Sequence, residues 1–293
     1  MLKNRLIFLF LTIGFLLPAS LTVADDASGL TVSSLADEAF IVSAHRAGPA
    51  SGFPENAIET MQHRLARDGF MVFELDVRAL GDGTLVLMHD NTLDRTSNGN
   101  GTLKALVKAD LDGIRLKDNR GRPTPYKIPT LREALRWANE RSILILDIKP
   151  GVEAAKLARV IKEEGAEARV LIICYRFMDA RTYARLLPAS GLTVTVQNEQ
   201  RFQALKALNL PRKQTWIWTG RHKLPSDFYA RMKKVAAHIQ RATFGAIDNQ
   251  AAAARSALIY SEILADGVTV LATNKPGRAV KARPPKTQTV AGN

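Results

Sequence analysis

The sequence has a single cysteine, Cys174, among its 293 residues. No disulfide can therefore form within the chain, whatever the redox state of its compartment. Leu171, Ile172 and Ile173 precede this cysteine, which indicates a buried strand and a packed thiol rather than a nucleophile. The stability of the fold must then come from an apolar core, for which a chain of this length is ample.

Acidic residues are in short supply: 28 Asp and Glu face 41 Lys and Arg, so the formal net charge is +13. Such a surplus favours anionic partners, such as phosphorylated substrates, anionic lipid head groups or nucleic acid. The basic residues are spread along the chain, and helix-turn-helix, zinc-finger and aromatic RNA-binding motifs are missing, so no nucleic acid is expected as a partner. Peripheral contact with an anionic membrane and a basic surface that serves solubility both stay open.

Long apolar runs are missing too, except at the N-terminus. Lys3 and Arg5 precede an apolar run over 6–17, and small residues lead from there to Ala24. This order predicts a cleaved signal peptide over 1–24, hence a periplasmic or secreted protein. A retained anchor is less favoured, because a spanning helix needs roughly 20 apolar residues. Cleavage would leave 269 residues with a charge of +11, since two basic residues leave with the peptide.

Short apolar segments alternate with longer amphipathic ones along the rest of the chain. We expect strands at 40–44, 72–77, 84–88, 143–148, 170–175, 192–196, 215–218, 243–247 and 268–272. Helical periodicity lies between most of them, at 59–68, 131–140, 153–164, 201–208, 226–238 and 251–264. About eight strand–helix units predict an α/β fold of the (β/α)8 TIM-barrel type. Residues 77 and 84 are too close for a parallel crossover, so one of the nine candidates should pair differently or lie outside the barrel.

Two stretches interrupt the alternation. Residues 91–130 are mostly polar and contain Asn98-Gly99-Asn100-Gly101, which predicts a small insertion after the third strand, on the face where His89 emerges. Residues 277–293 contain paired prolines and few apolar side chains, which predicts a disordered basic tail. The barrel domain is therefore expected over 25–276.

Polar side chains cluster at the carboxyl ends of four predicted strands. They are His45, Arg46, Glu74, Asp76, His89, Asp147 and Lys149. In a barrel the ends of parallel strands meet at one mouth, where activity sits. Each feature has an ordinary explanation when taken singly. A Glu-x-Asp pair can lie on a solvated strand edge, and a histidine after a strand can be a loop residue. An Asp-x-Lys pair can be a plain ion pair. Four such features at successive strand ends favour a site.

The chemistry of this set is coherent. Glu74 and Asp76 lie two apart, so both carboxylates share one face of a strand. Carboxylate oxygens suit a hard cation such as Ca²⁺ or Mg²⁺, which can draw in a phosphate oxygen while basic side chains balance the remaining charge. Two histidines can divide general acid and general base duties near neutral pH. The combination predicts hydrolysis of a phosphodiester.

Several motifs resemble the glycerophosphodiester phosphodiesterase family. In chain order they are His45-Arg46-Ala47-Gly48, Pro54-Glu55-Asn56, Glu74-Leu75-Asp76-Val77, Asp82-Gly83, His89-Asp90, Leu93-Asp94-Arg95-Thr96, Asp147-Ile148-Lys149 and Thr273-Asn274-Lys275-Pro276. The resemblance is dense from 41 to 101 and spans nearly all of the chain after the predicted signal peptide. It implies a TIM barrel that cleaves glycerophosphodiesters to glycerol 3-phosphate and an alcohol.

The resemblance also implies roles for single residues. By their match to the family's motifs, Glu74, Asp76 and Asp147 would bind a divalent metal, calcium or magnesium. His45 and His89 would carry out acid–base catalysis, and Arg46 and Lys149 would bind the phosphate. Glu55 would orient the site near His45.

The sequence also departs from the family pattern. Ala47 intervenes before Gly48, Asp147 stands where Glu is usual, Phe244 where Trp is usual, and Asn274 where Asp is usual. These changes indicate a divergent branch with an altered substrate. A lysophospholipase D or related phospholipid phosphodiesterase at a membrane surface is the main alternative. A non-catalytic phosphodiester-binding protein is less favoured, because both histidines are present.

Overall fold

The structure is a computed structural model that describes residues 29–284. The predicted signal peptide at 1–24 lies outside the described residues, as do residues 285–293 of the predicted tail. The described part of the predicted tail is helical, which corrects the prediction there: Pro276–Ala279 form α9 and Val280–Ala282 a 3-10 turn. Ala279 and Ala282 are buried against the barrel, which explains why this stretch is ordered despite its few apolar residues.

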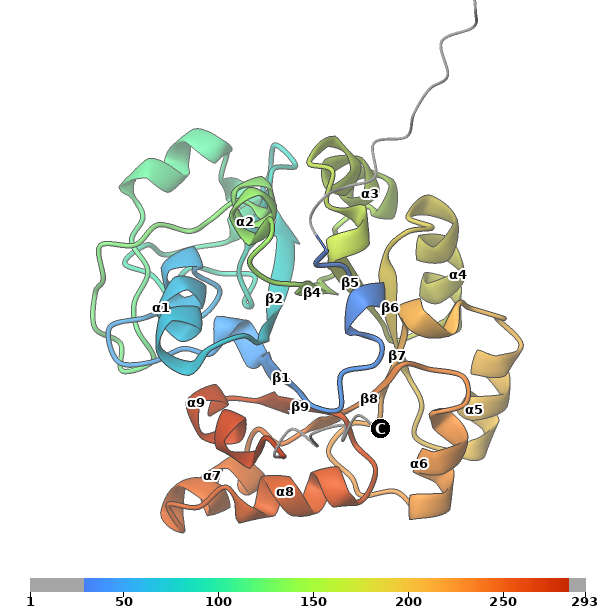
Figure 1. The fold of residues 1–293 in the computed structure, drawn as a ribbon. Coiled ribbons are helices and arrows are strands. Elements are labelled where there is room, and N and C mark those ends of the chain that lie inside the picture. The colour runs from blue at the N-terminus through green and yellow to red at the C-terminus, as the bar shows by residue number, and fades with distance from the viewer. Residues whose placement is uncertain (1–28, 285–293) are drawn as a thin grey trace, which may run out of the picture.

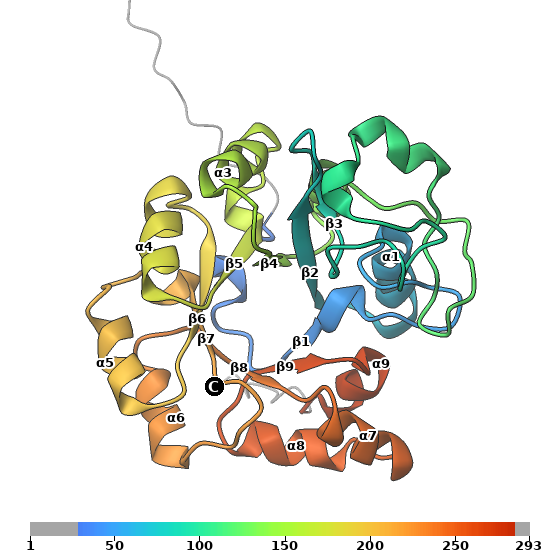
Figure 2. The same ribbon diagram turned by 180° about the vertical axis from the view of Figure 1, so that it is seen from behind.

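Eight parallel strands close into a barrel with helices around its outside (Figures 1 and 2). The barrel strands are β1 (Ile41–Ala44), β2 (Val72–Ala79), β4 (Leu144–Ile148), β5 (Val170–Cys174), β6 (Gly191–Thr195), β7 (Thr215–Trp218), β8 (His238–Ala242) and β9 (Val270–Thr273). The sheet closes because β1 pairs with both β9 and β2. This confirms the predicted (β/α)8 barrel. The ninth candidate, β3 (Leu85–Leu87), pairs antiparallel with β2 and lies outside the barrel, as the short link before it requires.

The helices follow the strands in chain order. They are α1 (Ile58–Asp68), α2 (Leu131–Ala138), α3 (Ala154–Glu163), α4 (Phe177–Leu186), α5 (Glu199–Lys206), α6 (Ser226–Met232), α7 (Ala246–Ala253) and α8 (Leu258–Ala265). The main apolar core lies between them and the outward faces of the strands. Among residues 29–284, no helix combines the length and the apolar character needed to cross a bilayer.

The eighth barrel strand is the main error of the sequence prediction. A strand was expected at 243–247 and a helix over 226–238, but α6 ends at Met232 and β8 runs from His238 to Ala242. The inward residues of β8 are polar, so its composition hides its strand character. Gly245 has φ 95° and precedes α7, which ends any extended run there. The helix predicted over 251–264 is likewise two helices, separated by a turn in which Arg255 has φ 51°.

The two ends of the barrel interior differ in chemistry. At the amino ends of the strands, Trp216, Ile145 and Val270 form an apolar plug, and Leu35 of the 3-10 turn Ser33–Leu35 packs beneath it. At the carboxyl ends, many of the inward side chains are polar or charged, among them Glu74, Asp76 and Asp147. Inside the barrel, a layer of apolar side chains at the amino ends of the strands therefore lies below a more polar layer at their carboxyl ends.

Residues 91–130 form a lobe beside the barrel, with short 3-10 turns at Leu103–Ala105 and Lys108–Gly113 (Figure 1). Met88, Leu93, Leu103 and others give this lobe a small apolar core of its own. The lobe returns to the barrel at Thr130, whose side chain caps α2 in a capping box with Glu133. The lobe therefore leaves and rejoins the barrel next to the strand end that carries His89.

Candidate active site

Three carboxylates gather at the carboxyl end of the barrel. Glu74 and Asp76 project inward from β2, and Asp147 stands beside Asp76 on the neighbouring strand β4. All three are buried, and one oxygen of each lies within 4.8 Å of the others. Their convergence is the arrangement that the sequence spacing predicted.

The charges of this cluster are only partly balanced. The ammonium of Lys149 lies 2.7 Å from Asp76 Oδ1 and 2.6 Å from Asp147 Oδ2. Burial would raise the pKa of Asp76, but Lys149 and the amide of Asn56 outweigh this and lower it. Burial and the nearby Asp76 raise the pKa of Glu74 well above its ordinary value. An additional cation would therefore stabilise Glu74 in its ionised form, and three clustered carboxylates are a donor set that fits Ca²⁺ or Mg²⁺.

The first candidate catalytic histidine, His45, is fixed on two sides at the end of β1. Its Nδ1 lies 2.7 Å from Asn274 Oδ1, and its ring stacks on Phe244 with centroids 4.4 Å apart. Its other nitrogen, Nε2, lies 3.9 Å from Glu74 Oε2. Burial lowers the pKa of His45, although the hydrogen bond to Asn274 opposes that effect. The neutral imidazole is therefore favoured, with Nε2 turned toward the carboxylates.

The backbone after His45 takes an unusual path. Arg46, Ala47 and Gly48 all have positive φ, at 51°, 67° and 70°. This path turns the Arg46 N–H toward Glu74 Oε2, to which it donates at 2.8 Å. Only glycine fits at 48, because a Cβ there would lie 2.8 Å from Pro276 Cγ. The inserted Ala47 thus belongs to a left-handed turn that brings a backbone donor to the cluster, at a conformational cost typical of functional sites.

The second candidate catalytic histidine, His89, lies where the chain leaves β3 for the lobe. Its Nδ1 is 2.7 Å from Asp90 Oδ1, and Asp90 also accepts from Arg95 at 2.6 Å. Arg95 in turn donates to Glu55 at 2.8 Å, and Glu55 accepts from Arg46 at 3.3 Å. The side chain of Glu55, which the sequence predicted to orient the site near His45, is therefore bonded to the two arginines.

A cavity of about 70 Å³ opens between these groups. His45, Glu74 and Asp147 line one side of it. The remaining walls are Ile173, Tyr175, Thr193, Trp218, Gln240, Phe244 and Ala272. Tyr175 donates to Asp147 Oδ2 at 3.1 Å, and burial raises the pKa of its phenol. The two tryptophans of β7 divide their roles: Trp218 faces the cavity, and Trp216 is fully buried in the apolar plug.

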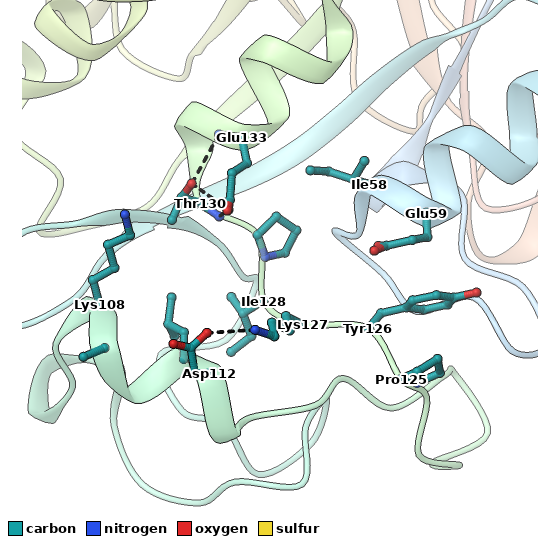
Figure 3. Close-up of a pocket in the computed structure, with 13 residues that line it drawn as sticks. Ile58, Glu59, Lys108, Asp112, Pro125, Tyr126, Lys127, Ile128, Thr130 and Glu133 are labelled. Atoms are coloured by element: carbon teal, nitrogen blue, oxygen red, sulfur yellow. Dashed lines mark hydrogen bonds and ion pairs between the residues drawn. The ribbon is translucent and has the colours of Figure 1, made fainter.

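A larger hollow of about 750 Å³ lies between α1, α2 and the lobe (Figure 3). Ile58, Lys108, Tyr126 and Thr130 are among the residues that line it, and Lys127 is paired with Asp112 at its edge. None of the clustered carboxylates and neither candidate histidine lines this hollow. His45, Glu74 and Asp147 line the smaller cavity instead, whereas Asp76 and His89 line neither.

Sequence reasoning missed the residues that hold the candidate catalytic groups in place. Asp248, buried on α7, accepts from the backbone N–H of Asn274 at 2.7 Å and from the hydroxyls of Thr243, Tyr260 and Thr273. It thereby fixes the loop that carries the partner of His45. No local motif marks Asp248, because its four donors come from three separate segments.

The fold and site together define a (β/α)8-barrel protein whose mouth carries two histidines and an acidic cluster that could hold a cation. The family model for the glycerophosphoryl diester phosphodiesterase family matches residues 45–257, and the chain belongs to that family. The predicted resemblance is thus confirmed.

Known relatives agree with this assignment. The chain is 35% identical over 162 residues to a glycerophosphodiester phosphodiesterase of Caldanaerobacter subterraneus, a match that covers 50% of this chain and 63% of the relative. It is 31% identical over 183 residues to a glycerophosphodiester phosphodiesterase of Bacillus subtilis, a match that covers 56% of this chain and 59% of the relative. The matches thus span about three fifths of these relatives' length.

Solved structures show the same fold over more of the chain. A glycerophosphoryl diester phosphodiesterase from Parabacteroides distasonis superposes with a TM-score of 0.80 at 30% identity, covering 86% of this chain and 91% of that one. A phosphodiesterase from Oleispira antarctica, solved with its product sn-glycerol-3-phosphate, has a TM-score of 0.62 at 19% identity, covering 83% and 96%. At that identity the second neighbour shows the fold alone.

Proposed function

We propose that this protein hydrolyses glycerophosphodiesters to glycerol 3-phosphate and an alcohol, in a reaction that depends on a divalent metal. The observation that carries the proposal is the cluster of three buried carboxylates at the barrel mouth, with His45 3.9 Å from Glu74 and with His89 near enough to Asp76 to lower the pKa of that carboxyl. The names of the relatives support it, as does the product bound by the Oleispira antarctica neighbour.

Glu74, Asp76 and Asp147 would hold the metal, for which we propose Ca²⁺ or Mg²⁺. When bound, such an ion polarises a phosphoryl oxygen and balances the charge that develops on it. Lys149 is bonded to two of the three carboxylates, and Arg46 lies 3.7 Å from Asp76. These two cations would bind the remaining phosphate oxygens.

His45 and His89 would divide the proton transfers. His45 is held neutral by burial, so it can accept a proton at Nε2 from the attacking hydroxyl. His89 is bonded through Nδ1 to Asp90, which leaves its Nε2 free to donate a proton to the departing alkoxide. Glu55 would act by bonding both Arg46, which follows His45, and Arg95, which also bonds Asp90 beside His89.

The test is release of glycerol 3-phosphate from glycerophosphocholine and glycerophosphoethanolamine, measured with Ca²⁺, with Mg²⁺ and with chelator. His45→Ala and His89→Ala should each lower kcat by roughly 10²- to 10⁴-fold, the usual worth of a general acid or base. His63→Ala is the matched control, because His63 stacks on Phe53 outside the site. Turnover that survives chelator or both substitutions would contradict the proposal. Ligand binding without any turnover would favour a phosphodiester-binding protein.

Lysophospholipids at a membrane surface are a second candidate substrate class. A groove of about 800 Å³ adjoins the cavity and shares Asp147, Ile173 and Tyr175 with it. Val152 adds an apolar wall, and Met178, which lies in sequence between the lining residues Arg176 and Asp179, is 75% exposed. Phosphodiester cleavage of lysophosphatidylcholine in vesicles, faster than that of glycerophosphocholine, would favour this class.

We further propose that the protein is exported, on the composition of residues 1–24 alone. Expression of the full chain in a bacterium, followed by N-terminal sequencing of the periplasmic fraction, tests this. A mature protein that starts near Asp25 is expected, and full-length protein retained in the cytoplasm would refute it.

A further inference from the structure

The cavity at the barrel mouth has two buried polar groups that the protein leaves without a partner. Thr193 on β6 and Gln240 on β8 both line it, and they are 1% and 3% exposed. Neither the Thr193 hydroxyl nor Gln240 Oε1 has a hydrogen-bond partner in the described part of the chain. On β1, the Ser43 hydroxyl is also buried and unpaired, next to Ala272 of the cavity wall.

Such groups are costly to bury, because they lose their hydrogen bonds to water and gain none in return. The barrel offers apolar side chains at equivalent inward positions, as Ile173 on β5 and Ala272 on β9 show. Valine or leucine at 193 or 240 would satisfy packing without the cost. The two polar side chains are therefore best explained by a polar ligand that reaches the cavity floor.

We propose that Thr193 and Gln240 bind the hydroxyl groups of the glycerol moiety, and so make the site select a small polyol ester. This rests on the function proposed above and adds specificity-determining residues to it. A hydroxyl can donate to Gln240 Oε1 and can exchange a hydrogen bond with Thr193. Trp218 and Phe244 form the apolar wall of the same cavity, against which the carbon atoms would pack.

The size of the cavity agrees with this class of ligand. The centres of water-sized groups can occupy about 70 Å³ of it. On that measure one water takes about 10–15 Å³, so the cavity has room for roughly five such groups, which is comparable to the non-hydrogen atoms of a glycerol moiety. The adjoining groove beyond Tyr175 is left for the alcohol on the other side of the phosphate.

The experiment compares binding of sn-glycerol 3-phosphate and n-propyl phosphate, which lacks both hydroxyls, by calorimetry with Ca²⁺ or Mg²⁺ present. Wild type should bind glycerol 3-phosphate more tightly. Thr193→Val and Gln240→Leu should each weaken that binding roughly three- to tenfold, the worth of one neutral hydrogen bond, and leave propyl phosphate affinity unchanged. Thr215→Val is the matched control, since it removes a strand hydroxyl that bonds Pro211 at the other end of β7.

The outcomes separate this inference from the proposed function. Equal affinity of wild type for the two phosphates, or variants that weaken both equally, would overturn the inference while glycerophosphocholine turnover persists. Thr193 and Gln240 would then serve internal water only. A wild type that neither binds these ligands nor turns over a glycerophosphodiester would overturn both. Thermal unfolding of each variant shows whether a lost affinity reflects a lost fold.

Discussion

The buried carboxylate of Asp248 offers the sharpest test of how the mouth of the barrel is held. Asp248 is 1% exposed and accepts from four groups: three hydroxyls and the backbone N–H of Asn274. Asp248→Ala would leave three of these donors without an acceptor, since the Thr243 hydroxyl also reaches the Ala272 carbonyl at 3.2 Å. At about 1 kcal/mol for each unpaired donor, the loss is about 3 kcal/mol, which is a large share of the 5–15 kcal/mol typical of a domain.

The assay is urea unfolding of Asp248→Ala and Asp248→Asn in the presence of chelator, with the free energy of unfolding taken at constant m-value. Asp248→Asn keeps one side-chain oxygen as an acceptor, so it should lose roughly half as much. Because Asn274 holds His45 at 2.7 Å, both variants should also lower kcat. The loss of activity should exceed that explained by the unfolded fraction.

A double-mutant cycle with Tyr260→Phe isolates the network. In wild type this change should cost about 1 kcal/mol, since the Tyr260 hydroxyl donates to Asp248 at 2.9 Å. In the Asp248→Ala background the same change should cost nothing or stabilise, because it then removes an unpaired hydroxyl. An equal cost in both backgrounds, or an Asp248→Ala loss below about 1.5 kcal/mol, would refute the reasoning.

Three further predictions concern charge. Glu74→Gln should abolish metal binding measured by calorimetry yet raise metal-free stability at neutral pH, because the raised pKa of Glu74 reflects an ionised form that burial disfavours. A metal-free protein that is less stable with Gln would contradict this. Asp90→Asn should lower kcat roughly tenfold with little change in KM, since His89 loses its anionic partner; an unchanged pH–rate profile would count against it. Burial lowers the pKa of His238 from 6.5 to about 4, so the unfolded chain takes the proton first and stability should fall by about 3 kcal/mol as pH drops from 6.5 to 4. His238→Gln should flatten that slope in pH-dependent unfolding, and an unchanged slope would assign the effect elsewhere.

The sequence predicted the parts of the fold whose chemistry is visible locally. β7 was predicted with its observed bounds, and the link after Val77 correctly implied a strand outside the barrel. Strand β8 was missed because His238 and Gln240 point into the barrel, where a sequence pattern leads one to expect apolar residues. His238 is satisfied there by the carbonyl of Leu35, a contact 203 residues away along the chain. Periodicity cannot reveal such a contact.

The candidate site likewise contains residues that could be predicted from the sequence and residues that could not. Glu74, Asp76 and Asp147 were predictable because strand ends in a barrel converge, and the structure does bring them together. Asp248 and Arg95 were not predicted to act in the site, because each matters only through partners that the fold delivers. Arg95 stands in one of the family motifs, but its bonds to Glu55 and Asp90 follow only from the fold, and the partners of Asp248 come from three separate segments.

Several destabilising features of this chain lie at the mouth of the barrel. They are the positive φ of Arg46, the buried carboxyl of Glu74 and the unpaired side chains of Thr193 and Gln240. The opposite end has dense apolar packing around Trp216 that can offset them, although the Trp216 N–H is itself buried and unpaired in the described part of the chain. A bound metal would remove the cost at Glu74, and a ligand hydroxyl would remove that at Thr193 and Gln240, whereas the backbone strain at Arg46 would persist. The groups that make the free protein less stable are therefore also groups that would favour the bound state. Substitutions that remove their unpaired or buried polar atoms should raise the free energy of unfolding and weaken ligand binding.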